Sequence, residues 1–257
     1  MSEDPASETL AEGSLISHLV ELRERIIKAF GGVLLVFLPL AFFARTIFTL
    51  VAQPLIEKLP EGASMIATAP ASPFLTPFKL SFFVALFIAM PWVLYQVWAF
   101  VAPGLYRHEK RFAVPLLISS IVLFYVGVAF AYFVVFPIMF GFFASVAPEG
   151  VAMMTDIGAY LDFVLALFLS FGLAFEVPVA TVLLVATGIV EIESLGKSRS
   201  YVLLGCFVIG MLLTPPDVLS QTLLAVPMYL LYEFGIVLAK VLMRERKEQK
   251  EDKPATS

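Results

Sequence analysis

Six long apolar segments constrain this chain more than any other feature of its sequence. They cover roughly residues 26–50, 74–102, 112–143, 157–187, 201–213 and 215–242, with polar or proline-rich connections between them. About 20 apolar residues suffice for a helix to cross the hydrocarbon core of a bilayer. Sixty per cent of the residues are hydrophobic and only 15% are charged, far from the averages of soluble domains. We therefore predict an all-α, polytopic membrane protein with six transmembrane helices.

The Lys and Arg residues predict the orientation of these helices. All but three of the 17 lie in the termini or in the second and fourth connections; the exceptions are Arg45, Lys58 and Lys79. Basic residues are retained on the cytoplasmic side of membranes, so both termini should be cytoplasmic. We expect an N-terminal cytoplasmic segment (1–25), a transmembrane domain (26–242) and a charged cytoplasmic tail (243–257).

The N-terminal segment contains an amphipathic stretch at residues 17–25. On a helix, Leu19 and Leu22 fall on one narrow stripe, while His18, Glu21 and Arg25 fall on the neighbouring flank. This pattern is typical of a helix that lies on a membrane surface with its polar flank facing water. It would hold Glu21 at a fixed height above the lipid.

The last three apolar segments have unusual lengths. The fourth would form about 46 Å of helix, which exceeds a core of about 30 Å, so it must tilt, bend or protrude. The fifth, 201–213, gives only about 20 Å, and the sixth reaches Glu233 after about 22 Å. Two adjacent short helices should leave a dent that a partner helix could fill. Met211, Thr214 and Gln221 lie at this dent, and they serve either partner binding or simple capping and hydrogen bonding between helices.

Catalytic machinery is not visible in the sequence. Neither histidine has a metal-ligand partner at helical spacing, and no nucleophile motif or phosphate-binding glycine loop is present. The single Cys206 cannot form an intramolecular disulfide. We predict no enzyme activity, no metal and no cofactor.

Two carboxylates are predicted to share the inner interface. Glu21 precedes the first span, and Glu109 lies in a charged cluster after the second span. Each is either an ordinary solvated charge, paired with Arg25 or Arg111, or half of a docking site for guanidinium groups, which bind carboxylates bidentately.

Glu176 is an acid deep within the fourth span. Placing an acidic group at a helix centre costs about 2.5–3.5 kcal/mol, so such residues usually face a polar cavity or a partner. The alternative is a protonated or hydrogen-bonded structural residue. Gln96 and Asp217 are further polar groups in or beside the spans.

The motifs together resemble the TatC family, the multispanning receptor subunit of the twin-arginine protein translocase. The resemblance runs from about His18 to Leu242. The matching motifs are HLVELRER (18–25), MIAT (65–68) with SPF (72–74), YQVWAF (95–100) with Pro103, YRHE (106–109), FAYF (130–133), FEVP (175–178) and LTPPD (213–217).

The resemblance implies a concave, cupped arrangement with Glu176 in the hollow. It implies that Glu21 and Glu109 receive the twin arginines of a folded cargo's signal peptide, and that Arg23, Phe100 and Pro54 belong to the same function. Single-span TatA- and TatB-type partners would bind at Met211, Thr214 and Gln221, in a self-associating complex of the bacterial cytoplasmic membrane driven by the proton-motive force.

Two other functions remain open at the level of sequence. Glu176 and the kinked helices are compatible with a proton-coupled small-solute transporter. An intramembrane enzyme ranks last, because it lacks a catalytic constellation. No feature points to a nucleic acid as partner.

Overall fold

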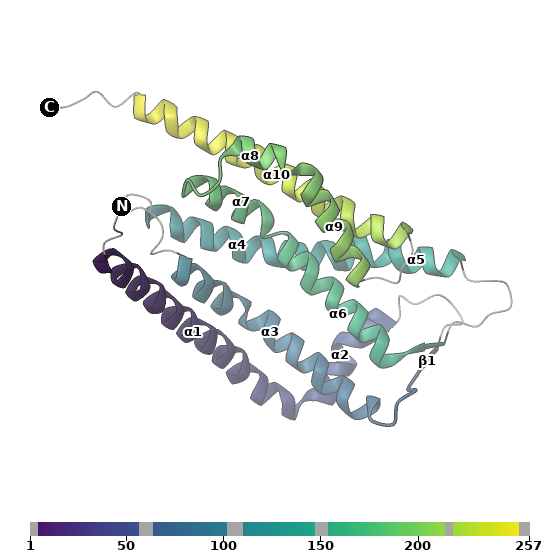
Figure 1. The fold of residues 1–257 in the computed structure, drawn as a ribbon. Coiled ribbons are helices and arrows are strands. Elements are labelled where there is room, and N and C mark those ends of the chain that lie inside the picture. Colours follow the sequence, from purple (N-terminus) through teal and green to yellow (C-terminus); the bar gives the residue numbers. More distant parts are fainter. Residues whose placement is uncertain (1–4, 57–63, 102–109, 147–153, 214–217, 252–257) are drawn as a thin grey trace.

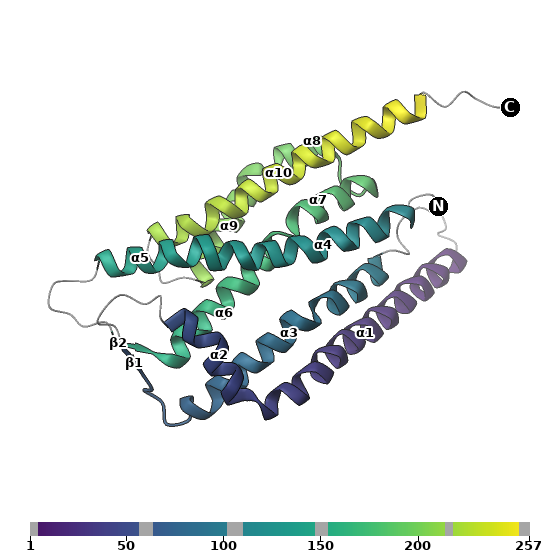
Figure 2. The ribbon, with the colours of Figure 1, turned by 180° about the vertical axis from the view of Figure 1, so that it is seen from behind.

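The computed structural model describes residues 5–56, 64–101, 110–146, 154–213 and 218–251 (Figures 1 and 2). Nearly all of them are helical. The elements are α1 (Pro5–Phe42), α2 (Ala44–Ile56), β1 (Ser64–Ile66), α3 (Ser72–Val101), α4 (Lys110–Phe130), the π-helical η2 (Ala131–Val135), α5 (Phe136–Val146), β2 (Met154–Asp156), α6 (Ile157–Ala174), α7 (Val177–Ala186), α8 (Ile192–Lys197), α9 (Arg199–Leu213) and α10 (Val218–Glu251).

Among the described residues, five helical stretches are long and apolar enough to span a membrane. They are Ile16–Phe42, Ser72–Val101, Val114–Phe142, Ile157–Ala186 and Gln221–Arg244, and the shorter apolar helix Arg199–Leu212 is the sixth. The predicted six-span, all-α architecture is confirmed; the described residues add the helices α2 and α8 and two three-residue strands.

The spans form an open, cupped array rather than a closed bundle. Helix α1 packs on α3 at one side, α10 packs on α7 and α9 at the other, and α4 and α6 connect the two sides (Figures 1 and 2). The fourth span lies at the centre, since 50% of its most apolar window is buried, against 6% for the first span. Phe124, Phe136 and Phe171 are fully buried where α4, α5 and α6 meet.

The first span differs from the prediction. Residues 17–25 do not form a separate helix on the membrane surface, because α1 continues without a break from Pro5 to Phe42. No proline interrupts it before Pro39, so nothing in the sequence ends the helix between the amphipathic stretch and the apolar run. Glu21 therefore lies on the first part of the transmembrane helix itself.

Prolines account for the irregular spans. The third span contains the π-helical η2 just before Pro137, and such segments bend helices. The long fourth span bends as predicted: α6 ends at Ala174 and α7 begins at Val177, with Pro178 in its first turn. At this break the Glu176 N–H bonds the Leu173 carbonyl oxygen, and Pro178 has no N–H to donate to the carbonyl of Ala174.

Of the two helices predicted to be short, only one is. Helix α9 ends at Leu213 after 15 residues, which confirms a fifth helix too short for an undeformed bilayer. Helix α10 does not end near Glu233 but continues to Glu251. No proline follows until Pro254, and the intervening residues are mostly good helix formers. The Thr214–Asp217 turn lies outside the described residues.

Two short strands pair at the end of the array opposite the chain termini (Figure 1). β1 and β2 pair in parallel, with Ser64 opposite Met154 and Ile66 opposite Asp156. Asp156 also caps α6 by accepting hydrogen bonds from the backbone N–H groups of Gly158 and Ala159. Its other oxygen accepts hydrogen bonds from the backbone N–H of Thr68 at 2.8 Å and from the Thr68 hydroxyl at 2.6 Å.

Candidate functional site

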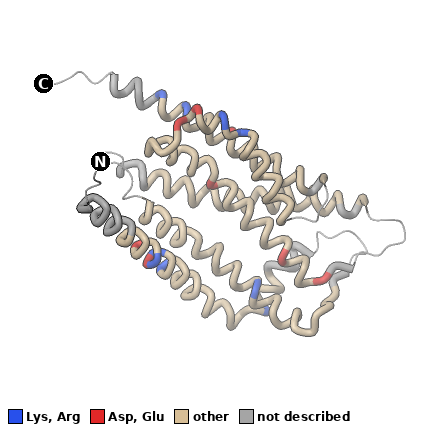
Figure 3. The backbone as a smooth tube through the Cα atoms, in the orientation of Figure 1, with Lys and Arg blue, Asp and Glu red and all other residues tan. Residues whose placement is uncertain are grey.

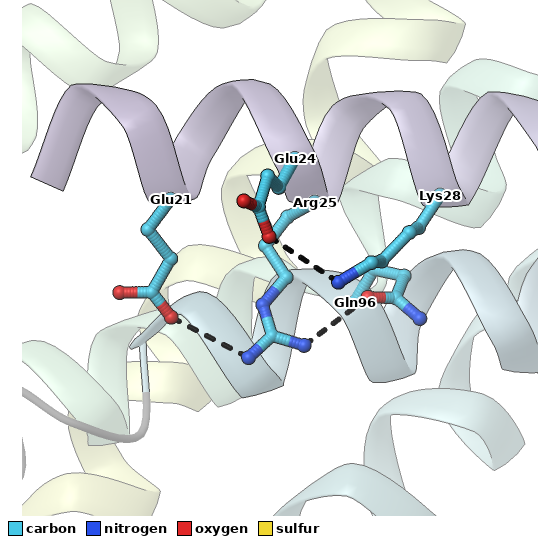
Figure 4. A network of polar contacts seen from close by, with 5 residues as sticks. All are labelled: Glu21, Glu24, Arg25, Lys28 and Gln96. Carbon is cyan, nitrogen blue, oxygen red and sulfur yellow. Dashed lines mark hydrogen bonds and ion pairs between the residues drawn. The ribbon is translucent and has the colours of Figure 1, made fainter. Parts of the chain in front are cut away.

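A polar network joins the first part of α1 to the last part of α3. The Arg25 guanidinium lies 3.4 Å from Glu21 Oε1 and donates another hydrogen bond to Gln96 Oε1, also at 3.4 Å (Figure 4). Glu24 and Lys28 form a second pair at 3.4 Å on the outer side of the helix. Glu21 and Arg25 are one helical turn apart, so the α-helix itself brings them together.

The Glu21 pair is neither buried nor fully solvated. Its side chains are 34% exposed for Glu21 and 27% for Arg25, whereas Gln96 is 2% exposed. Ion pairs this accessible contribute about 0–1 kcal/mol. The Glu21 carboxylate can therefore exchange its guanidinium partner at little cost, while Gln96 holds the other terminal nitrogen of Arg25.

Two aromatic contacts hold α1 against α3 on either side of this network. The His18 ring stacks on Phe100 with centroids 4.3 Å apart, and Trp92 Nε1 donates a hydrogen bond to the Lys28 carbonyl oxygen at 2.9 Å. Phe100 is half-buried and His18 is exposed. The predicted site residue Phe100 thus lies at the same end of α3 as Gln96.

The other residues predicted for this site are separated from Glu21 or lie outside the description. Arg23 is exposed. It is two residues from Glu21 on the same helix, so the two side chains do not share a face. Glu109 lies outside the described residues, so the predicted pairing of the two carboxylates stays a prediction.

Pro54 does not belong with Glu21. It lies in α2, which follows the far end of α1 (Figure 1). The 21 residues from Glu21 to Phe42 give about 32 Å of helix. The span itself separates the two residues, so Pro54 is not part of the Glu21 network, and its predicted role in signal-peptide binding stays a prediction.

The predicted partner surface lies where α9 meets α10. Met211 is 53% exposed and its neighbour Leu212 is 76% exposed. Gln221 instead points into the helix pair, donating from Nε2 to the Phe207 carbonyl oxygen at 2.9 Å. Gln221 therefore positions the two helices, and Met211 is on the free surface. Thr214 and Asp217 lie outside the described residues.

Glu176 lies at the break between α6 and α7, in the centre of the fourth span. Its Oε1 atom is buried and has no hydrogen-bond partner within the described part of the chain. The carboxyl contacts the Ser120 hydroxyl, and that hydroxyl accepts a hydrogen bond from Trp98 Nε1 at 3.1 Å. A polar chain thus runs from α3 through α4 to Glu176.

Two ion pairs between residues on different helices were not predicted from the sequence. Arg199 binds Glu233 bidentately, with Nε–Oε1 and Nη2–Oε2 distances of 2.7 and 2.8 Å, and Lys79 on α3 pairs with Asp162 on α6. The described charges gather along α1, around α8 to α10, and on α3 and α6 towards β1 and β2 (Figure 3). The only sequence signal was the cost of placing Glu233 inside an apolar segment, which favours a charged partner.

The described residues contain no group of three or more His, Cys, Asp or Glu side chains that could hold a metal ion. What they do contain is a weakly paired carboxylate at one end of the spans, an exposed apolar surface on a short helix, and a buried acid at mid-span. Together with the spans, these features define a multi-spanning membrane protein with a charged network at one end and an exposed apolar helix surface.

Comparison with known proteins gives the family. The model of the family "Sec-independent protein translocase protein (TatC)" matches residues 17–227. The TatC protein of Azotobacter chroococcum mcd 1 is 66% identical over 232 residues, covering 90% of this chain and 91% of that relative. TatC of Escherichia coli strain K12 is 57% identical over 237 residues, covering 92% of each chain.

A crystal structure of the twin arginine translocase receptor TatC superposes with a TM-score of 0.79 at 38% identity. The match covers 87% of this chain and 98% of that one. The chain therefore belongs to the TatC family. It is a multi-pass membrane component of a Sec-independent protein translocase, and such a component works in a complex with partners.

Proposed function

We propose that this chain is the receptor and core subunit of a twin-arginine translocase. It binds the twin-arginine signal peptides of folded proteins through Glu21, together with Glu109, at the cytoplasmic face of the bacterial inner membrane. The observation that carries this proposal is the state of Glu21: a partly exposed carboxylate that already holds the guanidinium of Arg25, which the buried amide of Gln96 binds from the other side.

The exchange of guanidinium groups is the proposed recognition step. Arg25 holds Glu21 through one contact of 3.4 Å, which is long for a charge-assisted hydrogen bond. An arginine of the signal peptide can approach the exposed side of the carboxylate and form a shorter, bidentate pair. Arg25 then retains its contact with Gln96. The second signal arginine would bind Glu109.

The remaining proposed contacts concern the rest of the complex. Phe100 and Arg23 flank the path of the signal peptide. TatA- and TatB-type single-span proteins bind the exposed apolar face at Met211, and Thr214 is a further predicted contact, while Gln221 supports that face through its bond to Phe207. The complex self-associates and uses the proton-motive force. The family assignment removes the reason to favour a small-solute transporter.

The test is site-specific crosslinking of a twin-arginine signal peptide to the complex. We expect Glu21→Gln combined with Glu109→Gln to reduce crosslinking at least about ten-fold, because each carboxylate loses a charge-assisted bond of about 1.5–3 kcal/mol. A signal with both arginines replaced by lysine should bind poorly to the unchanged protein, since lysine cannot form the bidentate pair.

Glu24→Gln is the matched control. Glu24 lies on the same helix, has the same i,i+4 cation partner at the same 3.4 Å, and is more exposed. It should leave crosslinking unchanged. If the double variant crosslinks as well as the Glu24→Gln control, the proposed recognition by Glu21 and Glu109 is wrong.

A further inference from the structure

A groove of about 600 Å³ lies between the connection from α7 to α8 and the later turns of α10. Glu191 and Glu193 line one part of it, and Lys240 and Arg244 on α10 line another. Apolar side chains, among them Val190 and Met243, complete the lining. The groove is separate from the Glu21 network, which lies on α1 and α3.

The groove lies at the depth of lipid headgroups. The fourth span ends at Ala186 and the last span ends at Arg244, and the groove is lined by residues at both of these ends. A membrane protein surface at this depth contacts the boundary between acyl chains and headgroups. The apolar lining is then available to an acyl chain, and the charged lining to a headgroup.

The four charged side chains that line the groove sum to zero net charge. Two acids face the groove together with two bases, and the helical spacing of Lys240 and Arg244 places both on one face of α10. Glu191, Glu193 and Lys240 are exposed and form no ion pair within the described part of the chain. The groove therefore offers donors for an anion and acceptors for a cation at the same time.

We propose that this groove binds a phospholipid with a phosphoethanolamine headgroup. The phosphate accepts hydrogen bonds from Lys240 and Arg244, the primary ammonium donates to the carboxylates of Glu191 and Glu193, and an acyl chain lies against Val190 and Met243. One zwitterion then pairs Glu191, Glu193 and Lys240, and Arg244 adds a second donor to the phosphate.

Other common headgroups fit less well. A phosphocholine headgroup has the same phosphate, but its quaternary ammonium has no N–H to donate to the carboxylates. A phosphoglycerol headgroup has no cation and brings its negative charge beside two acids. The two acids are therefore the residues that determine the preference.

The experiment measures lipid binding to the purified, delipidated full-length chain by native mass spectrometry. Phosphatidylethanolamine, phosphatidylcholine and phosphatidylglycerol with identical acyl chains are titrated in parallel. We expect phosphatidylethanolamine to bind about ten-fold more tightly than either of the others, as the gain of a charge-assisted hydrogen bond predicts. The double variant E191Q/E193Q should bind phosphatidylethanolamine and phosphatidylcholine equally.

Two controls keep the result specific to this groove. Glu24→Gln removes an exposed interfacial carboxylate from α1 and should keep the preference, and Lys240→Gln should weaken all three lipids together because it acts on the phosphate. Equal binding of the three lipids, a preference for phosphatidylglycerol, or an unchanged preference in E191Q/E193Q would each overturn the proposal. Signal-peptide crosslinking is independent of all of these outcomes.

Discussion

Arg199 and Glu233 form the best-defined ion pair among the described residues. Two parallel hydrogen bonds of 2.7 and 2.8 Å join the guanidinium to the carboxylate, and the Tyr229 hydroxyl donates a third at 2.8 Å. The pair ties the first turn of α9 to the middle of α10. It thereby orients the short helix whose exposed face we propose as the partner surface.

We expect Arg199→Gln to lower the free energy of unfolding in mixed micelles by about 1 kcal/mol. The value is small because Arg199 is 48% exposed and solvent screens the pair. Lys197→Gln is the control, since Lys197 is an exposed base two residues earlier that forms no ion pair with another described residue. Equal destabilisation by the two substitutions would show that the Arg199 pair contributes nothing specific.

Asp156 makes pH-dependent hydrogen bonds to Thr68 and to the first turn of α6, at the end of the molecule that carries β1 and β2. The Thr68 hydroxyl, followed by the backbone N–H groups of Thr68 and Ala159, lowers the pKa of Asp156 from 3.8 to about 2. These donors stabilise the ionised form. Because the pKa is lower in the folded state, the contribution is complete above about pH 4 and is lost as the pH falls towards 2.

The thermal midpoint of Asp156→Ala should therefore lie below that of the unchanged protein at neutral pH. The difference should shrink between pH 4 and pH 2, where Asp156 becomes protonated. Thr68→Val removes the strongest donor and should move this range to higher pH. A difference in midpoint that stays constant from pH 6 to pH 2 would contradict this account.

At the scale of elements, the contact between α4 and α6 depends on two glycines. A Cβ atom on Gly127 would lie 2.5 Å from the Phe171 carbonyl oxygen, and one on Gly172 would lie 2.6 Å from Phe124 Cε2. Small residues allow helices in membranes to approach closely. The central fourth span is held against the third in this way, and its position fixes the polar chain from Ser120 to Glu176.

We expect Gly127→Ala to destabilise the protein by about 1–3 kcal/mol, because the obstructing atom belongs to the backbone and the helices must separate. Gly141→Ala is the matched control: it lies in the same span and its added Cβ would meet nothing within 4 Å. Unfolding of both variants in mixed micelles measures the difference. Equal stability of the two variants would rule out a close contact at Gly127.

At the scale of the whole molecule, the array places α1 and α10 on opposite sides, joined through α3, α4, α6 and α7 (Figures 1 and 2). The beginning of α1 and the end of α10 lie at the same end of the array (Figure 1). The Glu21 network and the groove lined by Glu191 and Lys240 are therefore both at that end. The β1–β2 pair and Asp156 lie at the opposite end.

Thiol labelling tests the orientation of this array in the membrane. In a background with Cys206→Ala, we expect a cysteine at Ala69, which is exposed near β1, to react with a membrane-impermeant maleimide in intact cells. A cysteine at Lys197, exposed at the end of α8, should react only after the inner membrane is permeabilised. Reaction of the Lys197 position in intact cells would reverse the proposed orientation.

The sequence by itself determined the features that are additive along the chain. Hydropathy summed over about 20 residues marks each span, so the six spans and the short fifth helix were predictable. A proline bends or ends the helix that contains it, so the bend before Pro178 was predictable as well. Helix ends without proline were not: α1 begins well before the apolar run and α10 continues well beyond it.

Only the tertiary structure decided which polar groups meet. Arg25 and Gln96 are 71 residues apart and Arg199 and Glu233 are 34 apart, and no periodicity relates residues on different helices. Their contacts depend on how the bent helices pack. The close approach of α4 and α6 at Gly127 and Gly172 is part of this packing, and the sequence pattern does not show which residues meet there. The sequence could identify Glu176 as a costly charge, because desolvation is a property of one residue and its segment. The groups that it contacts are properties of the fold.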